Sequence, residues 1–158
     1  MAFDYDYTGN RSLLDRPTVA YFASREAPPA LCEQALRWAE ECRHTDRVVI
    51  SGFQSPLEKE VFQRLLQARH PLVWALGRSL YRRYVPEVQA AIDEGRLLVF
   101  AVRSTRRVGW HTAQVRNFTI ASFSDESVYA LNEQGRHSSL RTLYELEAAT
   151  AKTVRLLS

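Results

Sequence analysis

Residues 48–58 read Val-Val-Ile-Ser-Gly-Phe-Gln-Ser-Pro-Leu-Glu, and this stretch decides the fold. It opens with a short β-branched run that a glycine ends, which predicts a buried strand. Ser55 is placed to cap a helix, Pro56 suits the first helical position, and Glu58 completes a capping box. A buried strand that leads within a few residues into a capped helix is the repeating unit of an α/β fold.

Further apolar runs of strand length alternate with helical patterns on both sides of this unit. We predict these additional strands at 18–23, 72–76, 97–102, 127–131 and 153–157. The runs are nearly continuous in apolar residues, which is typical of parallel strands that helices cover on both faces. We therefore predict a Rossmann-like three-layer α/β/α sandwich with a mostly parallel sheet, formed by one domain over residues 17–158. Residues 1–16 are expected to form an irregular N-terminal arm.

The composition is that of a globular protein with a mild positive charge. The 158 residues are 46% hydrophobic and 25% charged, with a formal net charge of +3. Only two of the 21 basic residues are lysine, so 19 are arginine, whose planar fork suits phosphate and carboxylate groups. A coding sequence rich in G and C explains the same bias, and composition alone therefore does not establish nucleic-acid binding.

No segment predicts export, membrane insertion or metal binding. Residues 1–7 are acidic and aromatic, unlike a secretory signal, and the apolar runs are far shorter than the ~20 residues of a membrane span. We expect a cytoplasmic protein that makes no membrane contact. Cys32 and Cys42 lie on one predicted helix about 15 Å apart, too far for a disulfide. His111 and His137 have no carboxylate or cysteine at ligand spacing, so we expect neither a metal nor a cofactor.

The loops that follow the predicted strands carry serine, glycine and arginine. They span 23–25, 51–55, 77–79, 103–112 and 135–139. Parallel strands end at a common edge of the sheet, and folds of this kind bind ligands there. Small residues let the backbone approach a ligand closely, and helix N-termini attract anions, so we predict a site for a phosphate-bearing ligand. Ser55 and Ser139 are explained equally well as helix caps.

Four segments of the sequence share their order and residue types with a known family. They read Ala-Ser-Arg at 23–25, Ser-Gly-Phe at 51–53, Arg-Asn-Phe-Thr-Ile-Ala-Ser-Phe-Ser-Asp at 116–125 and His-Ser-Ser at 137–139. The sequence thereby resembles the Rossmann-like domain of the DNA-processing protein A family (DprA, also called Smf). This family belongs to the superfamily that also holds the lonely-guy (LOG) cytokinin-activating enzymes. The chain departs from the family pattern where Ala23 and a serine at 138 or 139 replace glycines.

The resemblance implies a non-catalytic domain that binds a nucleotide or single-stranded DNA and pairs as a homodimer. Together with the loops, it assigns ligand binding to Ser24, Arg25, Ser51, Gly52, Phe53, Arg116, Asn117, Ser138 and Ser139. Two roles remain open for Arg116, which either holds a phosphate with both arms of its fork in a crevice shared with Arg25, or braces its helix.

The segment 103–112 is a candidate for further nucleic-acid contacts. It carries Arg103, Arg106, Arg107 and Trp110, and arginines beside an aromatic ring are typical of single-strand binding surfaces. Alternatively, Trp110 contacts a partner subunit. The segment 81–84 is a second candidate for that contact.

The alternative function is that of a LOG-like hydrolase of nucleotide N-glycosidic bonds. The glycine-rich Pro-Gly-Gly-x-Gly-Thr loop and following glutamate of those enzymes have no match in this sequence.

Overall fold

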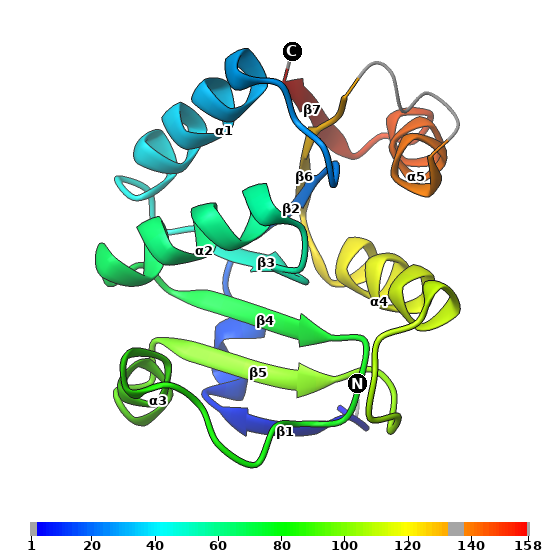
Figure 1. Ribbon diagram of the computed structural model, residues 1–158. Helices are drawn as coiled ribbons and strands as arrows, with labels where there is room; N and C mark the ends of the chain where they lie inside the picture. Colours follow the sequence, from blue (N-terminus) through cyan, green and yellow to red (C-terminus); the bar gives the residue numbers. More distant parts are fainter. Residues whose placement is uncertain (1–2, 133–137, 158) are drawn as a thin grey trace.

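The computed structural model describes residues 3–132 and 138–157, and within them all strands belong to one sheet (Figure 1). The strands lie in the order β1-β5-β4-β3-β2-β6-β7. Their bounds are β1 Asp6–Gly9, β2 Thr18–Ala23, β3 Val48–Ser51, β4 Leu72–Leu76, β5 Leu97–Ala101, β6 Glu126–Ala130 and β7 Thr153–Leu157. The helices are α1 Pro29–Cys42, α2 Pro56–Gln67, α3 Pro86–Asp93, α4 Trp110–Phe123, α5 Ser139–Ala148 and the 3-10 helix η1 Arg11–Asp15.

The sheet is mixed, because β1 pairs antiparallel with β5 while the other pairs are parallel. The expectation of an irregular arm over residues 1–16 was wrong for the part that forms β1 and η1. Aromatic packing by the residues just before β1 anchors this short strand, and the polar residues of the strand itself did not predict that packing. Phe3 and Tyr5 lie with their ring centroids 5.4 and 5.3 Å from that of Phe100 on β5.

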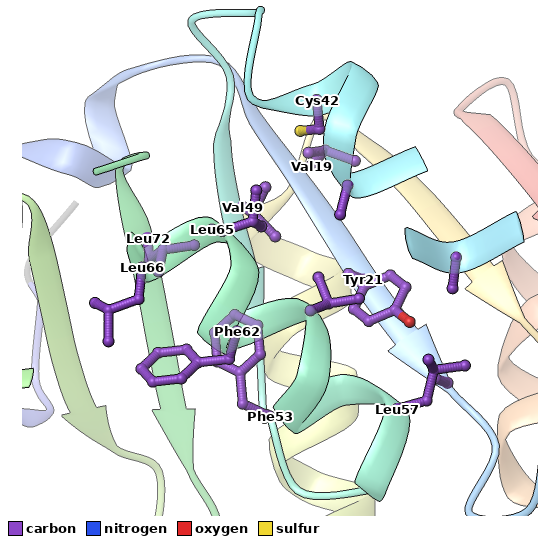
Figure 2. Packing of buried hydrophobic residues seen from close by; sticks show 14 of the residues in the cluster. Val19, Tyr21, Cys42, Val49, Phe53, Leu57, Phe62, Leu65, Leu66 and Leu72 are labelled. Carbon is purple, nitrogen blue, oxygen red and sulfur yellow. The ribbon is translucent and has the colours of Figure 1, made fainter. Parts of the chain in front are cut away.

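Helices cover both faces of the sheet, as the predicted three-layer arrangement requires. Helices α1, α2 and α3 pack on one face, where the buried core includes Leu65, Val49 and Tyr21 (Figure 2). Helices α4 and α5 and η1 pack on the other, around residues such as Ile120 and Phe22. Alternate residues of one strand therefore enter opposite cores, which explains the continuous apolar runs of the sequence.

Helix α4 begins at Trp110, inside the segment 103–112 that was predicted to be a loop. The Thr112 hydroxyl accepts a hydrogen bond from the Gly109 N–H (2.8 Å) and donates one to the Gly109 carbonyl (3.1 Å). These bonds satisfy backbone groups that a helix start leaves open, and so they extend the helix into the predicted loop.

The chain order places a topological switch point between β2 and β6. From β2 the chain adds β3, β4 and β5 in succession on one side, and then crosses back to add β6 and β7 on the other. The connections after β2 and β6 therefore diverge at the carboxyl edge, where α/β sheets of this kind open a crevice for ligands. No helix in the described ranges is long and apolar enough to cross a membrane.

Candidate functional site

A hollow of about 480 Å³ opens at the switch point between the ends of β2 and β6 and the start of α5. It is lined by Ser24, Arg25, Glu26, Asn132, Ser138, Ser139 and Leu140. Four of the predicted ligand-binding residues thus meet here, although more than a hundred positions separate Ser24 and Arg25 from Ser138 and Ser139 in the sequence. The parallel pairing of β2 with β6 brings them together.

The serine hydroxyls of this hollow act as acceptors in the bonds that they make within the protein. Ser24 Oγ accepts the Asn132 N–H (2.9 Å), and Ser139 Oγ accepts from Gln114 Nε2 (2.8 Å). Ser138 caps α5, its oxygen accepting a first-turn N–H at 3.2 Å. A hydroxyl that accepts still has its own hydrogen to donate, so all three side chains are able to donate to an anion.

The charge around this hollow is balanced. Arg25 and Glu26 are both exposed and lie side by side in the chain, so their formal charges cancel. The remaining electrostatic asymmetry comes from the N-terminal end of α5, where the helix dipole is positive. This combination suits one phosphate group held by several hydrogen-bond donors.

The β3–α2 turn is a rigid element at the same edge. Phe53 has a left-handed backbone (φ 44°), and the Ser51 hydroxyl accepts its N–H at 3.2 Å. The Gly52 carbonyl accepts a bond from Trp74 Nε1 (3.1 Å). The Phe53 ring packs in the core 4.7 Å from Phe62 (Figure 2) and the Ser51 side chain is fully buried, so both side chains hold the turn in place.

Arg116 lies beneath this turn and is only 5% exposed. Its Nη1 donates to Gln54 Oε1 and its Nε to Asn117 Oδ1 (3.2 Å). The guanidinium also lies directly against Gly52, where an added Cβ would be 2.6 Å from Nε. Burial lowers the pKa of Arg116, while the nearby Glu58 carboxylate opposes that shift. In this geometry Arg116 braces the β3–α2 turn, and it is not among the residues that line the hollow of Arg25.

Glu58 does more than the predicted capping box required. Its carboxylate, 6% exposed, accepts the N–H groups of Gln54 (2.9 Å) and Ser55 (3.1 Å) in the turn. It also accepts the Ala23 N–H (2.9 Å) at the end of β2. The carboxylate therefore ties two neighbouring carboxyl-end loops together, a long-range contact that the local sequence pattern does not reveal.

The arginine-rich β5–α4 connection lies at the same edge. Arg103, Arg106 and Arg107 are exposed, as the nucleic-acid prediction requires. Its backbone is joined to the β4–α3 connection, because the Ser79 N–H donates to the Thr105 carbonyl (2.7 Å). Trp110 is 76% exposed, but it starts α4 rather than lying in the loop.

The predictions for Trp110, for the loop 135–139 and for metal binding concern the surroundings of this edge. Trp110 and the half-exposed Phe118 line one hollow on α4 together with Ser138 and Ser139 at the start of α5. The predicted loop 135–139 is described only from Ser138 onward, and His137 lies outside the described residues. In the part of the chain that the structure covers, no three His, Cys, Asp or Glu side chains form a group able to hold a metal ion.

The fold and the donor-lined switch point define a Rossmann-like domain with a candidate ligand-binding edge. Two solved DprA structures are similar to it. The Helicobacter pylori protein, described for its single-stranded DNA binding mode, matches with a TM-score of 0.72 and 18% identity over 95% of this chain and 69% of its own. The Streptococcus pneumoniae protein matches with a TM-score of 0.63 and 20% identity over 78% of this chain.

These similarities confirm a DprA-like fold, and identities this low show the fold alone. The chain spans 44% of the length of the pneumococcal protein. A molybdenum cofactor binding protein from Rippkaea orientalis is also similar, with a TM-score of 0.57 and 14% identity over 89% of this chain and 76% of its own. No protein-family model matches the sequence, and no curated protein matches it.

Proposed function

We propose that this protein binds single-stranded DNA at the carboxyl-end loops of its sheet and does so without catalysis. The observation that carries the proposal is the switch-point hollow, which is lined by the donor-bearing side chains of Ser24, Arg25, Ser138 and Ser139. The described single-stranded DNA binding of the H. pylori neighbour supports this ligand.

The residues of the edge take different parts in this binding. The exposed Arg25 fork and the serine hydroxyls hold one phosphate at the N-terminal end of α5. The Gly52 turn, held by buried Arg116, keeps the neighbouring loop in position. The exposed Arg103 and Arg107 contact further phosphates along the strand.

The N-glycosidic hydrolase alternative requires a carboxylate that reaches a bound nucleotide. The buried Glu58 accepts three backbone N–H bonds and so is committed to holding the loops, whereas the exposed Glu26 lines the hollow beside Arg25. Incubation with nucleoside monophosphates followed by chromatography is the direct test, and release of free base would replace the binding proposal with a catalytic one.

Fluorescence anisotropy with a labelled oligo(dT) of about 12 nucleotides tests the proposal. We expect binding at about 50 mM NaCl that weakens steeply by about 200 mM, because each neutralised phosphate releases counterions. Arg25→Ala should weaken binding by about tenfold, since it removes a charge-assisted contact. The matched control is Arg37→Ala, which removes the same charge from the exposed surface of α1.

Two results would contradict the proposal. One is an absence of binding by the unaltered protein at low salt. The other is an equal loss of affinity in Arg25→Ala and Arg37→Ala, which would show non-specific attraction only. Competition by a mononucleotide at a concentration similar to that of the oligonucleotide would identify the ligand as a nucleotide instead.

A further inference from the structure

A second hollow, of about 520 Å³, lies at the same edge beyond β4 and β5. Its lining consists of Arg78, Ser79, Leu80, Tyr81, Arg82 and Arg106. Five of these residues come from the β4–α3 connection, of which only 77–79 was among the loops predicted to bind a ligand, and Arg106 comes from the β5–α4 connection. The Ser79–Thr105 backbone bond fixes the two connections against each other.

The Tyr81 ring in this hollow is held in place and yet remains accessible. The Arg78 guanidinium lies over the ring, 3.9 Å from its centroid, and Arg78 Nε donates to the Ser79 carbonyl (2.9 Å). The rings of Trp74 and Tyr84 lie 6.0 and 5.9 Å away, centroid to centroid. Tyr81 is still 39% exposed. An immobilised, exposed aromatic ring loses little entropy when a flat ligand stacks on it.

The residues that line this hollow include three arginines and no carboxylate. The sequence holds no Asp or Glu between residues 61 and 86 or between 95 and 124, and the first carboxylate after the β4–α3 connection is Glu87 in α3. Arg82 and Arg106 are exposed, and no carboxylate of the described residues pairs with either one within 4.0 Å. A polyanion is the chemical complement of such a surface. A second copy of the same positive patch would be repelled.

We propose that this hollow is a second subsite for the single strand bound at the switch point, in which a base stacks on Tyr81 and phosphates bind Arg82 and Arg106. The inference rests on the proposed function. Three strand spacings separate the β2–β6 junction from the β4–β5 junction, which is about 14 Å. At a rise of about 3.4 Å per stacked nucleotide, about four nucleotides bridge the two subsites.

Two sets of variants test the subsite with the same labelled oligo(dT). The double variant Arg82→Ala/Arg106→Ala should weaken binding at least tenfold and reduce the slope of log affinity against log salt by about 1.4, because single strands contribute about 0.7 per phosphate contact. The matched double control is Arg37→Ala/Arg64→Ala, which removes two exposed arginines from α1 and α2. The control should leave the slope close to that of the unaltered protein.

The stacking part is tested by Tyr81→Leu and Tyr81→Phe. We expect Tyr81→Leu to lose about tenfold in affinity for oligo(dT) and Tyr81→Phe to retain it, since the ring supplies the stacking. An abasic oligomer with the same number of phosphates should bind the unaltered protein and Tyr81→Leu with equal affinity. A misfolded Tyr81→Leu variant would bind this oligomer more weakly, so the comparison separates loss of stacking from loss of folding.

Each outcome has a distinct meaning. If the unaltered protein fails to bind, the proposed function and the subsite both fall. If it binds and Arg25→Ala weakens binding, while the Arg82/Arg106 and Tyr81 variants bind normally, the subsite alone is wrong. An unchanged salt slope in the Arg82→Ala/Arg106→Ala variant would likewise exclude phosphate contacts at this hollow.

Discussion

The contact between Gly52 and Arg116 makes a quantitative prediction about stability. An added Cβ at Gly52 would lie 2.6 Å from Arg116 Nε and 2.7 Å from Cζ, distances that atoms do not tolerate. The guanidinium is buried and bonded to Gln54, so it cannot move aside without breaking that bond. Gly52→Ala should therefore destabilise the fold by about 1–3 kcal/mol, as over-packing does elsewhere. For a chain of this size that corresponds to a fall in Tm of about 3–10 °C.

A double-mutant cycle isolates this contact from other effects. Arg116→Ala alone should cost about 2–4 kcal/mol, because it leaves a gap and removes the hydrogen bonds to Gln54 and Asn117. In Gly52→Ala/Arg116→Ala the clash is absent, so the combined cost should be smaller than the sum by about 1 kcal/mol or more. Urea unfolding followed by tryptophan fluorescence measures all four free energies.

Gly109→Ala is the control for this cycle, because a Cβ at Gly109 meets no atom within 4 Å. Paired with Arg116→Ala, it should give additive costs. The reasoning is refuted if Gly52→Ala and Arg116→Ala are additive to within about 0.5 kcal/mol. It is also refuted if Arg116→Ala leaves Tm unchanged and lowers only ligand affinity, the outcome expected of an arginine that binds phosphate.

Three further predictions concern the rest of the chain. His70 is buried, and its Nε2 donates to the Arg47 carbonyl (2.6 Å). Burial lowers the pKa of His70. The stability that His70 contributes is therefore complete above about pH 6.5 and declines as the pH falls below that value. Unfolding free energies at about pH 7.5 and 5.5 should differ less in His70→Asn than in the unaltered protein, and an equal difference would contradict this. Lys152 pairs with the nearly buried Glu147, so Lys152→Ala should lower the free energy of unfolding in urea by about 3 kcal/mol, because it leaves the Glu147 charge unpaired. Lys152→Ala/Glu147→Gln should cost less. Equal costs would exclude the unpaired Glu147 charge as the cause. The exposed Trp110 is the expected homodimer contact. Light scattering at tens of micromolar should therefore give the mass of a dimer for the unaltered protein and half that mass for Trp110→Ser. A monomeric mass of the unaltered protein would contradict the homodimer prediction.

Local patterns in the sequence predicted most of the fold. The β3–α2 unit was predicted because Ser55, Pro56 and Glu58 act within one helical turn, and the structure contains that capping box. Strand β1 was missed because its pairing with β5 depends on aromatic contacts between Phe3 and Phe100, which lie far apart in the sequence. Polar residues on an edge strand resemble those of an irregular segment, since solvent lies beside both.

The candidate site was predictable to the extent that strand ends define it. Ser24 and Ser139 were predicted from their positions after a strand and before a helix, and parallel pairing brings them together. The burial of Arg116 was left open, since the sequence does not show that Gly52 makes room for its guanidinium. The place of Tyr81 was not predicted either, because it depends on Arg78 covering the ring.

The arginines of this edge divide by burial into two groups with opposite experimental signatures. Arg116 is buried, bonded within the protein and adjacent to the glycine turn, so its removal should act through stability. Arg25, Arg82 and Arg106 are exposed, and a surface charge of this kind contributes little to folding. Their removal should act through affinity and its salt dependence while Tm stays nearly constant. A single arginine variant measured for both Tm and salt slope therefore shows whether the position shapes the binding edge or contacts the ligand, and the structure assigns each position before the measurement.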